Sequence, residues 1–368
     1  MESTLILIRF ASEIGLKGRN RIDFEKKLIN NIKEQIKRFS LILPMKTKKK
    51  PEFRIRKEHT RIIIEPSGKQ GSKGFSNEEL KIITTALRFV FGISSFSVVS
   101  VCEANMEDIK RESWIIFKEE LLKKIKEKSE DGFKGNDRDR KKKISFKVTT
   151  KRINKKFPIE SPGVNKIIGE YLLQKANHEI KETEVIVDLK EATINVQIEI
   201  LDRVFITTKR EDGLNGLPVG IQGEAILYLK DIKNKNDEEK ALLSCFLVMK
   251  RGVNIIIVGE EEEVKKHKAL IDKISLFTPE LKIKTTDKKS RNSRGNNMID
   301  TKGVVVEIKT IEEVMRSISQ ENLSENNKEN EKTQLKLLPL VTSKEFLNEK
   351  KKIIDSLLKL LKLNYGIN

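Results

Sequence analysis

The sequence has few of the side chains from which metal sites, disulfide frameworks and histidine-dependent catalytic sites are built. Among its 368 residues are two cysteines, Cys102 and Cys245, and three widely separated histidines. Two distant cysteines are too few for a tetrahedral zinc site or a disulfide framework, and scattered histidines give no support to a metal site or a triad. We therefore expect no metal, and we expect both cysteines to be buried core residues.

Long apolar runs are also lacking. No stretch reaches the roughly 18 consecutive apolar residues that a membrane-spanning helix needs. The apolar run at residues 5–10 is too short, and wrongly flanked, for a signal peptide. The sequence thus predicts a cytoplasmic protein without a membrane segment.

The balance of charge differs along the chain. Residues 1–211 hold 46 Lys and Arg against 31 Asp and Glu, whereas residues 212–368 hold 28 against 24. The first part therefore carries +15 of the net charge of +19, which indicates a polyanion partner that binds there. Aromatic residues make up only 5% of the chain. Base stacking on exposed rings is therefore disfavoured, and contacts to the phosphates of folded RNA are favoured.

Apolar periodicity divides the chain into three predicted domains, 1–108, 109–210 and 211–368. The first shows strands and helices in the order βαββαβ, which is typical of a ferredoxin-like fold. Its predicted strands are 5–10, 53–55, 61–65 and 94–101, and its predicted helices begin after Asn20 and at Asn77. The predicted fold class is a combination of α+β and α/β domains.

The second region is predicted to be a small α/β domain. A helix over 113–126 places Trp114 on its buried stripe, so we expect the one tryptophan in a core rather than on a base-stacking surface. The predicted strands are 146–150, 185–188, 194–200 and 204–208.

Four cations crowd onto the loop predicted after residue 150. They are Lys151, Arg152, Lys155 and Lys156. Ser161 can then cap a helix that has Pro162 at its first position. Free amides at a helix N-terminus beside such a cluster would form a phosphate-binding corner. The alternative is a solvated charge run before an ordinary capped helix.

Other cations extend this basic surface. The loop at 130–143 ends in a basic run, and a turn near the N-terminus carries three more cations. The candidate RNA-binding residues in these two segments are Arg140, Lys141, Lys142, Lys143, Lys17, Arg19 and Arg21. For the N-terminal turn, incidental surface charge is the alternative. A further basic stretch at 45–57 could either reach an RNA backbone or protect a sheet edge.

The third region shows the strand–helix–strand alternation of a parallel α/β sheet. Strands are predicted at 225–229 and 253–259, with a helix at 237–250 between them. Two polar stretches near 286–302 and 319–334 are predicted to be flexible loops.

Three stretches resemble a known family. The run KVTTKRINKKFPIESPGVNKIIGEYLL looks like the core of a THUMP domain, the RNA-binding module of several tRNA-modifying enzymes. ILIRFASEIGLKGRNRIDFEKKLINNIK, and GLNGLPVGIQG followed by LVMKRGVNIIIV, resemble segments of the tRNA sulfurtransferases that make 4-thiouridine. The resemblance implies a ferredoxin-like domain, a THUMP domain that recognises the tRNA acceptor end, and a PP-loop adenylation domain (an adenine nucleotide alpha hydrolase-like fold). It is collinear from Leu5 to about Val258 and patchy afterwards.

The sequence departs from this family at the ATP-binding turn and at the catalytic cysteine. In the resembled enzymes the turn after the first strand of the adenylation domain reads SGGxDS, whose glycines let backbone amides wrap the phosphates of ATP. Here that turn reads KDIK at 230–233, and no glycine lies between Gly223 and Gly252. The family's downstream cysteine has no counterpart either, since none follows Cys245. The sequence thus predicts a shortened, degenerate PP-loop domain without a cofactor.

Two functions compete. The first is a tRNA-binding protein that acts in tRNA thiolation as a binding or scaffold component, with a separate adenylating or sulfur-transfer protein as its partner. The alternative is an active tRNA sulfurtransferase that uses ATP and magnesium, with Asp231 or Asp237 as metal ligand, although these aspartates also suit a surface loop and a helix cap. A THUMP methyltransferase is a weaker option, because the chain has no Gly-rich SAM loop. The sequence favours the first function and leaves a homodimer open.

Overall fold

The structure, a computed structural model, describes residues 4–44, 50–67, 74–130, 142–181, 183–285, 308–310, 340–342 and 344–365. The chain forms two compact units, each assembled from three separate segments. Unit 1 consists of Met1–Arg9, Lys50–Leu80 and Ser95–Asp212, and unit 2 of Phe10–Lys49, Lys81–Ser94 and Gly213–Asn368. The predicted domain boundaries at 108 and 210 stay predictions.

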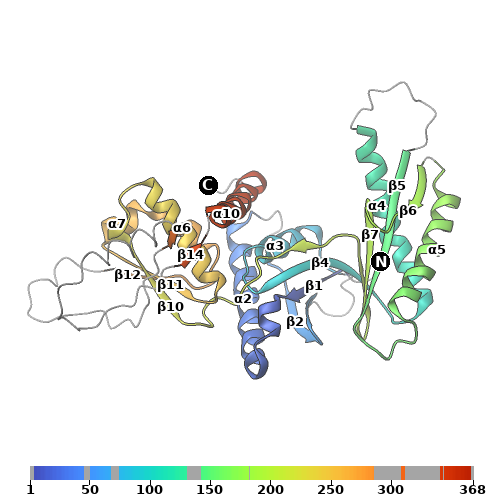
Figure 1. The fold of residues 1–368 in the computed structure, drawn as a ribbon, viewed down its shortest axis with the longest axis horizontal. Helices are drawn as coiled ribbons and strands as arrows, with labels where there is room; N and C mark the ends of the chain where they lie inside the picture. Colours follow the sequence, from blue (N-terminus) through green and yellow to red (C-terminus); the bar gives the residue numbers. More distant parts are fainter. Residues whose placement is uncertain are drawn as a thin grey trace, which may run out of the picture. The chain divides into compact units, whose positions relative to one another are not determined.

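Unit 1 is built on one nine-stranded sheet. Eight strands follow in the order β2-β3-β1-β4-β8-β7-β5-β6, and β9 pairs with β4. The strands are β1 (Leu5–Phe10), β2 (Phe53–Glu58), β3 (Arg61–Pro66), β4 (Ile93–Cys102), β5 (Lys142–Arg152), β6 (Thr183–Val187), β7 (Ile194–Ile200), β8 (Val204–Thr207) and β9 (Glu211–Asp212). Because β4 lies between β1 and β8, this one strand joins the two halves of the sheet (Figure 1).

The elements up to residue 102 follow the predicted βαββαβ order. The helices are α2 (Arg21–Ile42) and α3 (Asn77–Leu87), and the short α1 (Ser12–Gly15) and η1 (Gly18–Asn20) precede α2. β1 and β3 are antiparallel, with Leu7 opposite Ile63. Their apolar runs are buried on both faces, which explains why they lack a polar alternation. The ferredoxin-like prediction is confirmed.

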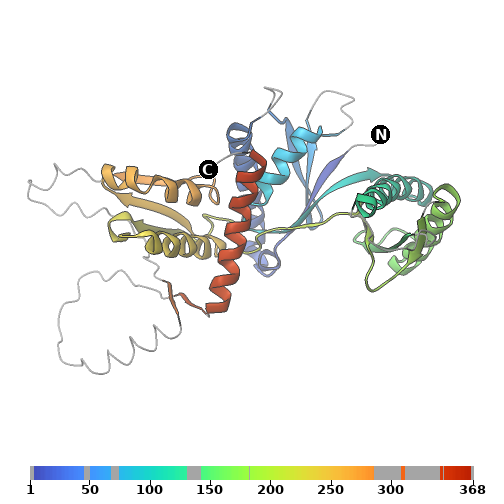
Figure 2. The same cartoon turned by 90° about the horizontal axis from the view of Figure 1, so that it is seen from above.

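The second half of the sheet forms a small α/β layer, as predicted. Helices α4 (Met106–Glu130) and α5 (Ser161–Glu179) lie side by side and pack on the sheet (Figure 2). The core between helices and sheet includes Phe117, Phe146 and Ile168, which are fully buried. The Trp114 ring is also buried, which confirms its predicted place in the core.

Strand β5 is longer than predicted. It begins at Lys142 instead of residue 146, and it continues past residue 150 because its parallel pairing with β7 runs on as far as Arg152 opposite Ile200. The prediction that Lys151 and Arg152 lie in the following loop is therefore wrong. Both residues end the strand.

Two helix starts also differ from the prediction. α4 begins at Met106 instead of residue 113, because the side chain of Asn105 accepts a hydrogen bond from a backbone amide of the first turn (2.9 Å). In α5 the N-cap position is Glu160, which makes no side-chain cap bond, and Ser161 is the first helical residue. The predicted cap at Ser161 with Pro162 in the first helical position is thus wrong by one residue.

Unit 2 contains a three-stranded parallel sheet in the order β10-β11-β12. Its elements are β10 (Glu224–Tyr228), η2 (Leu229–Asp231), α6 (Lys235–Lys250), β11 (Asn254–Gly259), α7 (Glu261–Lys266), α8 (Lys268–Ser275), β12 (Lys282–Thr285) and α10 (Lys344–Tyr365). β13 (Ile308–Thr310) and β14 (Leu340–Thr342) form a separate parallel pair. The predicted parallel α/β arrangement is confirmed. The loops predicted at 286–302 and 319–334 lie outside the described residues.

Five phenylalanines form the centre of unit 2. The ring centroid of Phe277 lies 5.3 Å from that of Phe246 and 5.4 Å from that of Phe89. Phe39 of α2 lies 5.2 Å from Phe89, and Phe91 lies 5.0 Å from Phe246. All five side chains are at most 1% exposed. Because Phe39 comes from the N-terminal region, this cluster packs α2 against the C-terminal α/β layer.

Polar bonds from α2 reinforce that packing. The side-chain amide of Asn31 donates to the carbonyl of Val219 (3.0 Å), and Nη1 of Arg38 donates to the carbonyl of Thr278 (3.0 Å) just beyond α8. Each bond satisfies a carbonyl outside regular secondary structure. In the part of the chain that the structure describes, no helix is long and apolar enough to span a membrane.

Candidate nucleic-acid interface

One face of β5 is open to solvent at its cationic end. Successive residues of a strand point to opposite faces. Phe146 and Val148 are buried in the core with α4 and α5, whereas Thr149 and Lys151 are exposed and Lys147 is half-buried. Lys151 therefore ends an exposed polar row, on the sheet face opposite the helices.

Arg152 links the end of β5 to the start of α5. Its Nη1 donates to the carbonyl of Phe157 (2.8 Å), and its Nη2 lies 3.8 Å from the carboxylate of Glu160. Its backbone amide donates to Oγ of Ser161 (3.3 Å). The Arg152 side chain is only 16% exposed. Its guanidinium thus shapes the loop, and its contact with RNA remains a prediction.

The loop after β5 is fixed by backbone bonds. The amides of Ile153 and Asn154 both donate to the carbonyl of Ile200, each at 2.9 Å. The amide of Lys156 then donates to the side-chain oxygen of Asn154 (3.0 Å), which closes a tight turn. Lys155 and Lys156 are exposed on this turn. The exposed cations Lys151, Lys155 and Lys156 therefore lie within six residues, at the end of β5 and on the turn that leads to α5.

The basic run before β5 is described only in part. Lys143 is exposed on β5 and its Nζ lies 3.3 Å from the carboxylate of Glu184 on β6. Lys142 is the first residue of β5. Arg140 and Lys141 lie outside the described residues.

The N-terminal cations form a separate candidate surface in unit 2. Nζ of Lys17 lies 5.0 Å from the ring centroid of Phe24, and Nε of Arg21 lies 2.7 Å from the carboxylate of Glu25. Both side chains are half-buried, whereas Arg19 is exposed in η1. Lys17 and Arg21 therefore also have local structural contacts, as the alternative interpretation of this turn expects.

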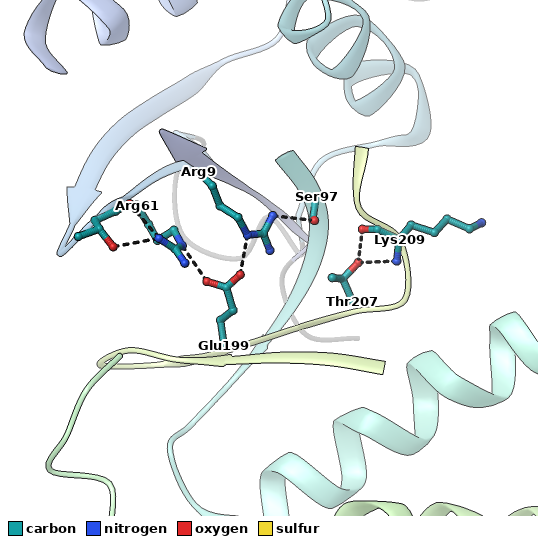
Figure 3. A network of polar contacts seen from close by, with 7 residues as sticks. Arg9, Arg61, Ser97, Glu199, Thr207 and Lys209 are labelled. Carbon is teal, nitrogen blue, oxygen red and sulfur yellow. Dashed lines mark hydrogen bonds and ion pairs between the residues drawn. The ribbon is translucent and has the colours of Figure 1, made fainter. Parts of the chain in front are cut away.

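The sequence analysis missed a buried ionic network in unit 1 (Figure 3). The carboxylate of Glu199 on β7 accepts two hydrogen bonds, from Nε of Arg9 on β1 (2.6 Å) and from Nε of Arg61 on β3 (2.7 Å). Nη1 of Arg9 also donates to Oγ of Ser97 (3.1 Å). All three charged residues are at most 7% exposed. Since Glu199 lies opposite Lys151 in the sheet, the network connects the cationic end of β5 with the ferredoxin-like strands.

The charges of the network determine its protonation. Burial alone would raise the pKa of Glu199, but the positive charges of Arg9 and Arg61 and their hydrogen bonds outweigh burial and hold its pKa below the usual value. Burial lowers the pKa of Arg9, although the carboxylate of Glu199 opposes that shift. A signal for this network exists in the sequence, because charged residues inside apolar strands such as LILIRF and INVQIEI are rarely buried without a partner.

The turn after β10, the candidate nucleotide site, is filled by its own side chains. The side-chain oxygen of Asn234 accepts the backbone amides of Asn236 (2.9 Å) and Asp237 (3.1 Å). Oδ2 of Asp237 accepts the amides of Lys233 (3.0 Å) and Asn234 (3.2 Å). This capping box satisfies the amides that a phosphate would need at the start of α6. No described residue from β10 to the end of α6 has a positive φ.

Replacing Asn234 with alanine is expected to lower the free energy of unfolding by about 1 kcal/mol, because two amides of α6 lose their acceptor. Urea denaturation of the variant and the parent protein measures this difference. The variant Asn236→Ala is the control, since the Asn236 side chain is not part of the capping box. Equal losses in both variants would contradict the assigned role of Asn234.

The two cysteines are buried, as predicted. Cys245 on α6 is 3% exposed, and burial raises its pKa to about 12. A thiol with that pKa stays protonated at neutral pH and is a poor nucleophile. In the described ranges, no group of three or more His, Cys, Asp or Glu is placed to hold a metal ion.

Two family models match the chain. Residues 5–97 match the ThiI ferredoxin-like domain, and residues 103–209 match the THUMP domain. The chain is therefore a THUMP-domain protein that carries a ThiI-type ferredoxin-like domain before the THUMP domain.

The chain is similar to curated proteins that are named probable tRNA sulfurtransferase. A probable tRNA sulfurtransferase of Halothermothrix orenii is 31% identical over 255 residues, which cover 68% of this chain and 52% of the relative. That of Bacillus subtilis is 31% identical over 251 residues, which cover 68% and 50%. The resemblance that the sequence stretches indicated is confirmed. The chain spans about half the length of these relatives, and the degenerate PP-loop stays a prediction.

Two solved structures share the fold. PH1313 from Pyrococcus horikoshii matches 96% of this chain and 99% of its own, with a TM-score of 0.61 and 22% identity. A 4-thiouridine synthetase in complex with RNA and with bound ATP matches 77% of this chain and 62% of its own, with a TM-score of 0.51 and 24% identity. At these identities the likeness shows the fold alone.

Proposed function

We propose that this protein binds tRNA and acts in tRNA thiolation in the cytoplasm. The observation that carries the proposal is a group of exposed cations, Lys151 at the end of β5 with Lys155 and Lys156 on the turn after it. We call this group the cationic turn, and bonds to the carbonyl of Ile200 hold its backbone in place. A fixed backbone lets lysines meet phosphates without ordering a loop on binding. The name of the relatives, tRNA sulfurtransferase, supports tRNA as the polyanion.

We further propose that the chain contributes binding or a scaffold, while a separate adenylating or sulfur-transfer protein supplies the chemistry. Two observations support this. The amides at the start of α6 are already bonded to Asn234 and Asp237, and the thiol of Cys245 is buried with a raised pKa. The alternative, an active sulfurtransferase with its own ATP site, is supported by the parallel β10-β11-β12 sheet and by the bound ATP of the 4-thiouridine synthetase of similar fold.

Binding and exchange measurements distinguish these functions. We expect an unmodified tRNA transcript to bind at least about tenfold more tightly than a DNA duplex of equal length at moderate salt, because RNA-shape recognition adds to the general attraction of phosphates. We expect no ATP–pyrophosphate exchange by the protein alone. Equal affinity for the two nucleic acids would contradict tRNA binding. If the parent protein shows more ATP–pyrophosphate exchange than a Lys230→Ala, Lys233→Ala double variant, the active enzyme is favoured.

A further inference from the structure

Two arginines of β2 and one from the turn before β8 gather over one buried carboxylate in unit 1. Nε of Arg54 and Nε of Arg56 lie 3.1 and 3.0 Å from Oε1 of Glu65, and Nη2 of Arg203 lies 3.7 Å from Oε2. The four side chains line a shallow, open hollow of about 460 Å³. We call this group the arginine hollow.

The strand register explains why these side chains meet. Arg54 lies opposite Glu65 in the β2–β3 pair, and Arg56 is two residues further along the same face. Arg203 belongs to the turn between β7 and β8. β2 is an edge strand of the nine-stranded sheet, so no strand of the described residues pairs with its outer side. The Arg54 side chain is 70% exposed, and those of Arg56 and Arg203 are 35% and 34% exposed.

The hollow has the charge and chemistry of an anion subsite. Its three guanidinium groups face the carboxylate of Glu65 and that of Glu58, which lies 2.7 Å from Nη1 of Arg56. One positive charge therefore remains. Glu65 is 6% exposed, and Oε1 accepts no aligned hydrogen bond from any described side chain. Arg54 and Arg56 approach Glu65 through Nε, within ion-pair distance, and planar guanidinium groups suit the oxygens of a phosphate.

The hollow is connected to the cationic turn described above. The amide of Asp202, next to Arg203, donates to the carboxylate of Glu58 (3.1 Å). The side-chain amide of Asn154 donates a long hydrogen bond to the carboxylate of Asp202 (3.4 Å). Asn154 in turn shapes the turn that carries Lys155. Both cationic groups thus belong to unit 1 and share one chain of polar contacts.

We propose that the arginine hollow is a second phosphate subsite for the RNA that the cationic turn binds. The inference rests on the proposed function and adds the ferredoxin-like edge to the RNA-binding surface. The hollow binds a backbone phosphate, because its guanidinium groups supply charge-assisted N–H donors to phosphate oxygens.

The test compares two charge-matched triple variants. The first is Arg54→Gln, Arg56→Gln, Arg203→Gln. The control is Lys118→Gln, Lys123→Gln, Lys124→Gln on α4, where the three lysines pair with glutamates at the helix surface. Affinity for a tRNA transcript is measured between about 50 and 200 mM salt. We expect the arginine variant to bind on the order of tenfold more weakly and to lower the slope of log Kd against log salt by about 2, with the control unchanged.

Two further measurements keep the outcome unambiguous. The variant Arg54→Lys, Arg56→Lys, Arg203→Lys keeps the charge and should retain the parent salt slope. The single variant Arg54→Gln replaces the most exposed arginine and serves if the triple variant does not fold. In one outcome the parent protein binds tRNA while the arginine variant and the control variant show equal affinity and equal salt slope. That result would overturn the assignment of the hollow as a phosphate subsite and leave the proposed function standing. Failure of the parent protein to bind tRNA would overturn the proposed function as well.

Discussion

Reversing the charge of Lys151, Lys155 and Lys156 to glutamate is expected to weaken tRNA binding on the order of 100-fold at moderate salt. Each lysine lost from a phosphate contact costs up to about 1 kcal/mol, and the new carboxylates repel the RNA backbone. The three side chains are exposed, and the backbone bonds that fix the turn do not involve their amino groups. Fluorescence anisotropy with a labelled tRNA transcript measures the loss.

A matched reversal separates position from net charge. The control Lys118→Glu, Lys123→Glu, Lys124→Glu makes the same change of net charge on α4, which packs on the other face of the sheet from Lys151. We expect a loss of less than about threefold there, since only long-range attraction to the RNA changes. Equal losses in the two variants would mean that general positive charge, rather than this turn, binds the RNA.

Replacing Glu199 with alanine is expected to destabilise unit 1 by about 3–5 kcal/mol. The change leaves the guanidinium groups of Arg9 and Arg61 buried without a counter-charge, which costs far more than a surface ion pair. Urea denaturation measures the loss of stability, and hydrogen exchange of β1, β3 and β7 amides shows whether the loss is local to this network. A loss below about 1 kcal/mol would contradict the role of Glu199 as their counter-charge.

The same network makes a prediction about pH. The folded-state pKa of Glu199 is depressed, so its stabilising contribution is fully present above its unfolded pKa of about 4.3 and is lost as the pH falls through the folded value. The difference in unfolding free energy between the parent protein and Glu199→Gln should therefore be constant above about pH 5 and should narrow below it. A gap that widens on acidification would contradict the depressed pKa.

Local periodicity was enough to predict most helices and strands. In α2 the apolar positions Phe24, Leu28, Ile32, Ile36 and Phe39 recur at helical spacing, and all five are buried. The spacing predicts which face is buried because it depends only on helix geometry. Helix starts were less predictable. The shift from Ser161 to Glu160 at the start of α5 reflects a tertiary bond, since the Ser161 hydroxyl accepts the Arg152 amide instead of capping the helix.

Long-range pairing limited the prediction of the site. The cations at the end of β5 and on the turn after it were found in the sequence because they lie within six residues of one another, but their partners were not. Arg152 bonds to Phe157 and is largely buried, so it contributes to the loop more than its charge alone indicates. Arg9 and Glu199 are 190 residues apart and meet only because β4 brings two sets of strands into one sheet. The charge inside each apolar strand signals that a partner exists, but no local pattern shows which residue that partner is.

The shared strand β4 has a consequence for how such proteins are divided. The ferredoxin-like match ends at residue 97 and the THUMP match begins at 103, yet β4 runs unbroken from Ile93 to Cys102. The boundary between the two matched domains thus falls within one continuous β-strand. Moving the THUMP domain into another enzyme would require moving β4 with it. A cut within β4 would remove the residue that pairs with Val204 and leave β8 as an unpaired, aggregation-prone edge strand.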